Sequence, residues 1–567
     1  MLHVLLLSIS LAAVTPPPPP PSLAPIATPT PAPDEVIESP SPSPSPGPTA
    51  TPTPSGPRLT VSPATLELNP AQQRSVVVSG GSPPLTATLD GKLVQVATND
   101  NATGVTITAT QQTGTDVLHL LDANGARADI PIRVAFNAGT IAATATLKVT
   151  GSPADGAWLV AQVKGLVAQL TQAMPSAQTT FGNPVPPVPT PLPPGASMQF
   201  TVPVQIASTD GQYFDQSGST VVNVQNVPAD PFAPLQLFYD DDPEHVSADG
   251  VLFRGTVTSA QPARLYYYHD NAGDPRRVVV VLSSASQDPT SVQLIDASAG
   301  PNADVMSVGH AVTRNFLLTK PKNQGTILDL STDEPYVLKD VAMTPRQGAA
   351  GNLDIRVLSG GPLTVTVLTV SPGVDPRTLL TAAPLPDDGH HRTGVFQLTG
   401  FGSDALAYSA GGPDAKVAIG DRQPTAPNAD PAAAGHDYGD YGVWHSIAIA
   451  LSNPSPAPVT AYLYFKPLVG IARSSFLVDG SLVEIGCVRV PQPYQIAAIP
   501  LAAGASQQVR LDTMTDGGSF YPVEIGVTST PPALGAPPIS GPDGCFPKPA
   551  AVQPPPPAPE ASPSHLR

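Results

Sequence analysis

The stretch HDYGDYGVWH, residues 436–445, gathers side chains that are suited to binding a ligand. It contains one of the two tryptophans of a chain in which only 5% of the residues are aromatic. The rings of Tyr438, Tyr441 and Trp444 offer flat apolar faces on which a sugar ring can stack. Two other interpretations stay open. The stretch can be the entry to a strand whose rings cover a sheet edge or a neighbouring domain, because Asp-Tyr-Gly suits turns, or it can be a metal site.

Two acidic loops are candidates for binding calcium, which prefers six to eight oxygen ligands. The first loop, YDDDPEH, supplies Asp240, Asp241, Asp242 and Glu244. The second, PDDGHHR, places Asp387 and Asp388 beside His390 and His391. Neither loop has the alternating D-x-D-x-D-G pattern of a strong calcium motif, and solvated turns are the alternative because aspartate favours turns. The two adjacent histidines would point to opposite faces of a strand, so they are poor joint ligands.

Motifs for known catalytic chemistry are missing. The patterns G-x-S-x-G, H-E-x-x-H, C-x-x-C and G-x-x-x-x-G-K-[ST] do not occur in the sequence. GFGSDA, which begins at Gly400, matches G-x-G-x-x-A, but the residues that follow do not have the pattern of a helix that could receive a pyrophosphate. The sequence therefore predicts a protein that is not an enzyme and needs no cofactor.

The only two cysteines, Cys487 and Cys545, are expected to form a disulfide. An exported chain meets an oxidising compartment in many envelopes, where a lone pair of cysteines is more often bridged than free. Two buried free thiols are the alternative.

Most of the chain between its termini has the sequence pattern of β-strands, and these strands must position the residues named above. Val105, Ile107 and Ala109 alternate with threonines, which is the period of a half-buried strand. One helix is predicted in DGAWLVAQVKGLVAQLTQAM, with Asp155 as its cap and Pro175 beyond its end. Its apolar stripe should pack on a sheet and consists of Leu159, Val163, Leu166 and Leu170.

The predicted fold class is all-β and multidomain, with tandem Ig-like β-sandwiches, one β domain that contains a helix, and disordered Pro-rich termini. A chain of 567 residues is too long for one core, and its 74 prolines are concentrated in a few blocks. The expected segments are a signal peptide (1–14), a Pro-rich linker (15–57), an Ig-like sandwich (58–137), the helix-containing domain (138–230), two further sandwiches (231–378 and 379–531) and a Pro-rich tail (532–567).

Compartment and partners follow from the termini and the charge. The apolar run from Val4 to Val14 fits a secretory signal and is too short for a stable transmembrane anchor. The net charge of −17 disfavours binding to nucleic acid. We therefore expect a secreted or cell-envelope protein whose partner is a cell-wall or extracellular polysaccharide or a surface protein.

Residues 59–137 resemble bacterial Ig-like domains of the group 2 type. The shared motifs are a Val-x-Pro first strand and a later G-x-x-x-L-x-L-x-D-x-x-G hairpin, matched by Val61, Pro63, Gly114, Leu118, Leu120, Asp122 and Gly125. The rest resembles a long β-rich region of secreted bacterial proteins, some of which also carry a copper amine oxidase N-terminal-like stalk domain. The first resemblance implies a structural or adhesive module. The quinone-forming Asn-Tyr-Asp or Asn-Tyr-Glu of copper amine oxidases is absent.

Together, these features predict an exported, non-enzymatic, multidomain β-sandwich protein of the cell surface or envelope, which acts in adhesion, assembly or display. Two alternatives remain, a carbohydrate-binding accessory protein and a hydrolase whose site is assembled from residues scattered in the sequence.

Overall fold

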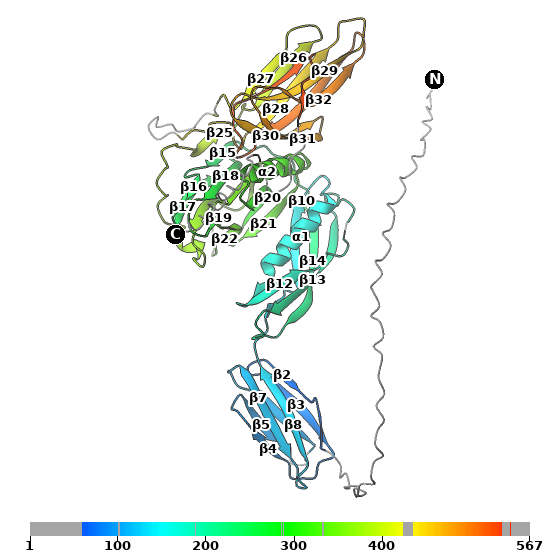
Figure 1. The fold of residues 1–567 in the computed structure, drawn as a ribbon, viewed down its shortest axis with the longest axis vertical. Coiled ribbons are helices and arrows are strands. Elements are labelled where there is room, and N and C mark those ends of the chain that lie inside the picture. Colours follow the sequence, from blue (N-terminus) through cyan, green and yellow to red (C-terminus); the bar gives the residue numbers. More distant parts are fainter. Residues whose placement is uncertain are drawn as a thin grey trace, which may run out of the picture.

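The computed structural model describes residues 59–99, 103–187, 189–284, 286, 288–331, 334–422, 424, 435–535 and 545. The expected signal peptide (1–14), the Pro-rich linker (15–57) and nearly all of the tail (532–567) lie outside these residues. The described chain is all-β and multidomain, as predicted, with two α-helices among its strands (Figure 1). Neither of these helices is long and apolar enough to cross a membrane.

The first unit is a two-sheet sandwich at one end of the molecule (Figure 1). Its strands bury alternate residues, so that Val105, Ile107 and Ala109 face the core as predicted. One sheet has the order β1 (Thr60–Ser62), β3 (Gln73–Ser79), β6 (Gly104–Ala109) and β5 (Val94–Thr98). The other has the order β2 (Leu66–Leu68), β8 (Arg127–Val134), β7 (Gly114–Leu121) and β4 (Thr86–Leu89).

The second unit packs the predicted helix, α1 (Gly156–Leu170), on a sheet. The Asp155 carboxylate caps the helix by accepting hydrogen bonds from the backbone N–H groups of Ala157 and Trp158. Leu159 and Val163 are buried as predicted, whereas Leu166 is half-buried and Leu170 is exposed, and the buried face continues through Val167 instead. The strands are β10 (Thr144–Thr150), β12 (Ala177–Phe181), β13 (Ser197–Ser208) and β14 (Gln216–Asn226), with a separate pair β9 (Gly139–Thr140) and β11 (Gln172–Ala173).

This sheet does not end at the expected boundary between residues 230 and 231. Strand β10 pairs with β14 on one side and with β21 (Gly325–Leu330) of the next unit on the other. An 11-stranded sheet therefore runs through both units. Strand β25 (Thr393–Gln397), expected in the last domain, also belongs to this sheet, because it pairs with β15 (Gln236–Asp240).

The central unit has three layers, in which α2 (Val305–Thr319) and a four-stranded sheet cover opposite faces of the large sheet. Because both faces of the large sheet are covered, its central strands contain continuous runs of apolar residues and do not alternate between apolar and polar residues. The remaining strands of the large sheet are β16 (His245–Val246), β18 (Ala263–Asn271), β20 (Thr290–Asn302) and β23 (Gly348–Ser359). The smaller sheet has the order β17 (Gly250–Val257), β24 (Leu363–Val370), β19 (Arg276–Ser284) and β22 (Tyr336–Met343). Two short 3₁₀ turns are η1 (Lys320–Lys322) and η2 (Pro376–Leu379).

The sequence pattern predicted a β-sandwich for residues 231–378 and a helix only in residues 138–230, but the structure has a second helix, α2, within this range. Asp304 caps this helix through the N–H of Ser307, and Pro321 follows its end. Its buried face spans Met306 to Thr319 and packs against the large sheet and the last sandwich.

The last unit is a sandwich of two five-stranded sheets. One has the order β26 (Ser403–Ser409), β28 (Trp444–Ser452), β33 (Ser506–Met514), β30 (Ile471–Val478) and β31 (Ser481–Arg489). The other has the order β27 (Ala415–Ile419), β34 (Val523–Thr528), β29 (Val459–Pro467), β32 (Tyr494–Leu501) and β35 (Ala533–Leu534).

Helix α2 lies between the large sheet and the last sandwich and forms the junction between them (Figure 1). Gly309 permits this close approach, because a Cβ at that position would lie 2.5 Å from the Cα of Gly517. His310 is buried beside this contact, with its Nδ1 2.6 Å from Asp516 and its Nε2 3.0 Å from Glu484.

A buried arginine fixes the same junction. The Arg473 side chain donates to Ser307 Oγ of α2 and, through Nε, to both sulfurs of Cys487 and Cys545. The two cysteines lie at disulfide distance, with a Cα–Cα separation of 5.5 Å, as predicted. Residue 545 is thereby held against the last sandwich.

Candidate ligand-binding site

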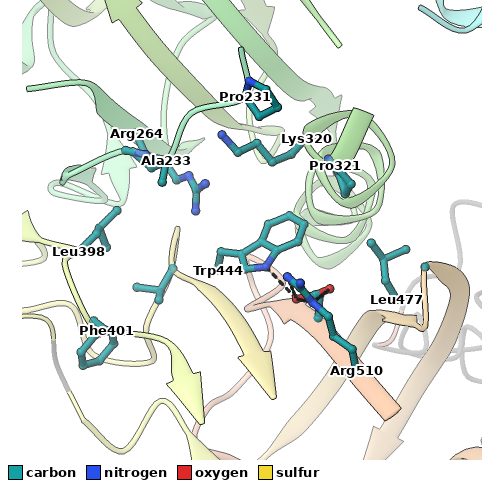
Figure 2. Close-up of a pocket in the computed structure, with 14 residues that line it drawn as sticks. Pro231, Ala233, Arg264, Lys320, Pro321, Leu398, Phe401, Trp444, Leu477 and Arg510 are labelled. Carbon is teal, nitrogen blue, oxygen red and sulfur yellow. Dashed lines mark hydrogen bonds and ion pairs between the residues drawn. The ribbon is translucent and has the colours of Figure 1, made fainter. Parts of the chain in front are cut away.

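A cavity of about 600 Å³ opens where the central unit meets the last sandwich. Figure 2 shows Trp444 near its centre, between Lys320 and Pro321 on one side and Arg510 on the other. The walls come from the linker before β15, from β18 and η1 of the central unit, and from β28 and β33 of the last sandwich. A site between two units is a common location for a ligand pocket.

Trp444 points into the cavity because of its position in β28. Ile447, Ile449 and Leu451 face the sandwich core, so Trp444 lies on the opposite face, as the alternation predicted. Its ring meets that of Phe316 edge to face, with centroids 6.4 Å apart. The ring is half-buried and retains an accessible surface in the cavity.

The ion pair between Arg510 and Asp512 lies beside the indole of Trp444. Strand β33 pairs with β28 so that Asp512 and Arg510 follow each other on the same face as Trp444. Trp444 Nε1 donates to Asp512 Oδ1 at 3.1 Å, and Arg510 binds the same carboxylate through Nε and Nη2. The Arg510 side chain is 65% exposed, so it is available to a ligand.

The facing wall holds two cations, Arg264 and Lys320, which share the buried carboxylate of Asp354 at 2.6 and 2.5 Å. Burial alone would raise the pKa of Asp354, but the two cations outweigh this effect, so the pKa of this carboxyl lies below its usual value. Burial lowers the pKa of Lys320, and the charge of Arg264 adds to this effect against the attraction of Asp354. Arg264 also donates to the carbonyl of Gly442, which ties the two units together.

The rings of Tyr438, Tyr441 and Trp444 do not lie together as one surface on which a sugar could stack. Tyr438 is exposed and stacks on His436 at 4.8 Å. Tyr441 packs against Tyr266 and donates its hydroxyl to the backbone carbonyl of Ser519. Of the three, only Trp444 lines the cavity.

Most of the HDYGDYG segment lies at the junction between the central unit and the last sandwich. This arrangement fits the interpretation in which its rings cover a neighbouring domain. Gly442 lies so close to the central sheet that a Cβ would come within 2.7 Å of Tyr266 and 2.8 Å of Leu237. Asp437 is fully buried, which raises the pKa of its carboxyl together with the nearby charge of Asp440.

The residues of the first acidic loop point to different partners. Asp240 is buried 3.3 Å from His269, and burial raises the pKa of this carboxyl despite the attraction of the histidine. Asp241 accepts from the Tyr239 hydroxyl, and Glu244 pairs with Arg392 at 2.5 Å. The four residues therefore do not surround a common point.

The two acidic loops instead meet each other. Asp242, Asp387 and Asp388 each present an oxygen within 4.8 Å of the others, which is a spacing that could hold a cation. Burial and the neighbouring carboxylates raise the pKa of Asp242 to about 6. The Asp242 carboxylate already accepts from the backbone N–H groups of Asp388 and Arg392.

Sequence reasoning missed Arg264, Lys320, Arg510 and Asp512, which provide the charges of the cavity. For Arg510 and Asp512 a signal was present, because they alternate with buried Val509 and Leu511 in β33. No comparable signal marks Arg264 and Lys320, because only the tertiary fold brings them to the cavity.

No family model and no curated protein sequence matches the chain. Among solved structures, a tri-modular endo-β-1,4-glucanase from Bacillus licheniformis matches at 13% identity and a TM-score of 0.13, over 30% of this chain and 39% of that one. The mixed-linkage glucan protein SGBP-B of Bacteroides ovatus matches at 10% identity and a TM-score of 0.13, over 54% and 71%. The EC1-2 fragment of human mucin-like protocadherin matches at 13% identity and a TM-score of 0.11, over 30% and 100%. The chain thus spans well under half of the glucanase.

Proposed function

We propose that this protein is an exported, non-enzymatic protein of the cell surface or envelope that acts in adhesion or assembly by binding carbohydrate at the Trp444 cavity. The observation that carries this proposal is the indole of Trp444 beside the Arg510–Asp512 pair in a cavity of about 600 Å³.

The chemistry of these three side chains suits a sugar. The apolar face of a pyranose ring stacks on an indole, and its hydroxyls need donors and acceptors at fixed positions. The Arg510–Asp512 pair supplies both kinds of group at the edge of the Trp444 ring. The pair is held in place by the strand, so little side-chain entropy is lost on binding.

Export is supported by the apolar N-terminal run and by the cysteine pair at disulfide distance, since disulfides persist in oxidising compartments. The Pro-rich segment after that run would place the binding units at a distance from the surface.

The test is a glycan array probed with the full mature chain and with Trp444→Ala. We expect at least one glycan class to bind and the variant to lose about 1 kcal/mol or more of binding free energy. Trp158→Ala is the matched control, because Trp158 is the other tryptophan and lies on α1, away from the cavity. Arg510→Gln changes an exposed residue and should weaken binding without affecting folding.

Two results would contradict the proposal. One is the absence of binding to every glycan, and the other is binding that Trp444→Ala and Arg510→Gln leave unchanged while the circular dichroism spectra stay native.

A further inference from the structure

The charges around the cavity are opposite in sign to those of the whole chain. The protein has 44 acidic and 27 basic residues, and its net charge is −17. The cavity nevertheless has three cations in its wall, Arg264, Lys320 and Arg510, against the single carboxylate of Asp512. With Asp354 behind the wall counted as well, one positive charge remains unbalanced.

Two of these cations retain hydrogen-bonding capacity. Arg510 uses Nε and Nη2 on Asp512, and its Nη1 has no hydrogen-bond partner among the described residues. Lys320 donates to Asp354 and to the carbonyl of Phe232, which leaves one of its three ammonium hydrogens. Figure 2 shows the two side chains on opposite sides of the Trp444 ring.

An unbalanced cation in a partly buried site is costly, because it has lost part of its hydration. Lys320 is in this position, since Arg264 shares Asp354, the one carboxylate that pairs with Lys320 among the described residues. A ligand that brings a negative charge would restore the balance, whereas a neutral ligand would cover the cation without compensating it.

We infer that the cavity selects an acidic sugar, with the ring stacked on Trp444 and its carboxylate bound by Arg510, while Lys320 on the other side of the indole adds to the attraction for a negative charge. This inference rests on the proposed carbohydrate-binding function and specifies the ligand class. Asp512 does not oppose such a ligand, because Arg510 and the indole N–H already compensate its charge. A uronic acid is the simplest sugar that combines a stacking face with a carboxylate on the ring.

The experiment measures Trp444 fluorescence in the full mature chain carrying Trp158→Phe, which leaves Trp444 as the only tryptophan. The probes are oligogalacturonate, alginate and hyaluronan oligosaccharides, each compared with its carboxyl-reduced, neutral form. We expect at least one acidic probe to bind tenfold or more tightly than its reduced form. Added salt should weaken only the acidic probe.

Arg510→Gln should remove most of this preference, because it should weaken binding of the acidic probe much more than binding of the reduced form. Lys416→Gln is the matched control, because it removes one exposed cation of the same sandwich on a strand outside the cavity. Equal affinity for both forms, or binding of neutral glycans alone, would overturn the inference and leave the proposed function standing. If no glycan, acidic or neutral, binds on the array or changes the fluorescence, the proposed function itself fails.

Discussion

Replacing Gly309 with alanine tests how closely α2 and the last sandwich are packed. In an isolated helix this change is favourable by about 1 kcal/mol, because glycine loses more backbone entropy than alanine. In the protein the new methyl group would lie against the carbonyl oxygen of Gly517, and 2.5 Å from its Cα. No real Cβ approaches heavy atoms this closely, so the helix and the facing loop must separate.

The balance of these two effects predicts a net destabilisation. Overpacking of a tight interface costs about 1–3 kcal/mol, and the obstacle here is backbone that cannot rotate away, so the upper end applies. Subtracting the gain in helix propensity leaves a loss of about 2 kcal/mol. Gly165 of α1 is the matched control, because a Cβ there meets nothing within 4 Å, and Gly165→Ala should stabilise by up to about 1 kcal/mol.

Denaturant unfolding followed by Trp444 fluorescence is the appropriate assay, in the Trp158→Phe background. Trp444 contacts Phe316 of α2, so its emission reports the junction directly. A Gly309→Ala protein as stable as the Gly165→Ala protein would refute the reasoning, since it would show that the junction accommodates a methyl group without cost.

Two further predictions concern groups that hold the junction. Burial lowers the pKa of His310, but its two carboxylate partners outweigh it and raise the pKa above 6.5. A histidine with a raised folded-state pKa stabilises fully below the unfolded pKa and loses this effect as pH rises through the folded pKa. The denaturant concentration at the unfolding midpoint should therefore decrease as the pH rises above 6.5 and through the raised pKa of folded His310. His310→Gln should flatten that dependence, whereas an unchanged profile would argue against a charged His310 beside its two carboxylates. Cys545→Ser opens a loop with a sequence separation of 58 and should cost about 4 kcal/mol in chemical denaturation; no difference from the wild type would mean that Cys487 and Cys545 are not bridged in solution.

The local sequence pattern was sufficient to predict whether a residue is buried where that burial depends only on the residue's own strand or helix. The alternation in β28 correctly placed Ile447, Ile449 and Leu451 in the core and Trp444 on the other face. The cap at Asp155 and the apolar spacing after it correctly located α1. These features arise from contacts within one unit, which the sequence period describes.

Helix α2 shows where the pattern was insufficient. Its sequence, VMSVGHAVTRNFLLT, includes three valines and a central glycine, which are poor helix formers. The helix forms because its buried face packs on both the large sheet and the last sandwich, and tertiary packing outweighs propensity. The cap at Asp304 and the proline at residue 321 were the signals that could have revealed it.

The same limit applies to the candidate site. A single sequence could identify Trp444 as unusual, but it could not show that Tyr441 would turn toward Tyr266 of another unit. Nor could it bring Lys320 to the cavity, because Lys320 lies 124 positions before Trp444 in the chain. Contacts between units depend on the relative positions of whole sheets, which no local period records.

The strand pairing between β10 and β21 has a consequence for how such a protein can evolve. Lys148, Val149 and Thr150 pair with Ile327, Thr326 and Gly325, so each unit covers an edge of the other's sheet. A gene rearrangement that separated the units near residue 230 would leave β21 with bare N–H and C=O groups, which recruit strands from other molecules. The second and central units should therefore be inherited as one block, while the first sandwich, whose sheets share no strand with them, can be gained, lost or repeated without creating an aggregation-prone edge.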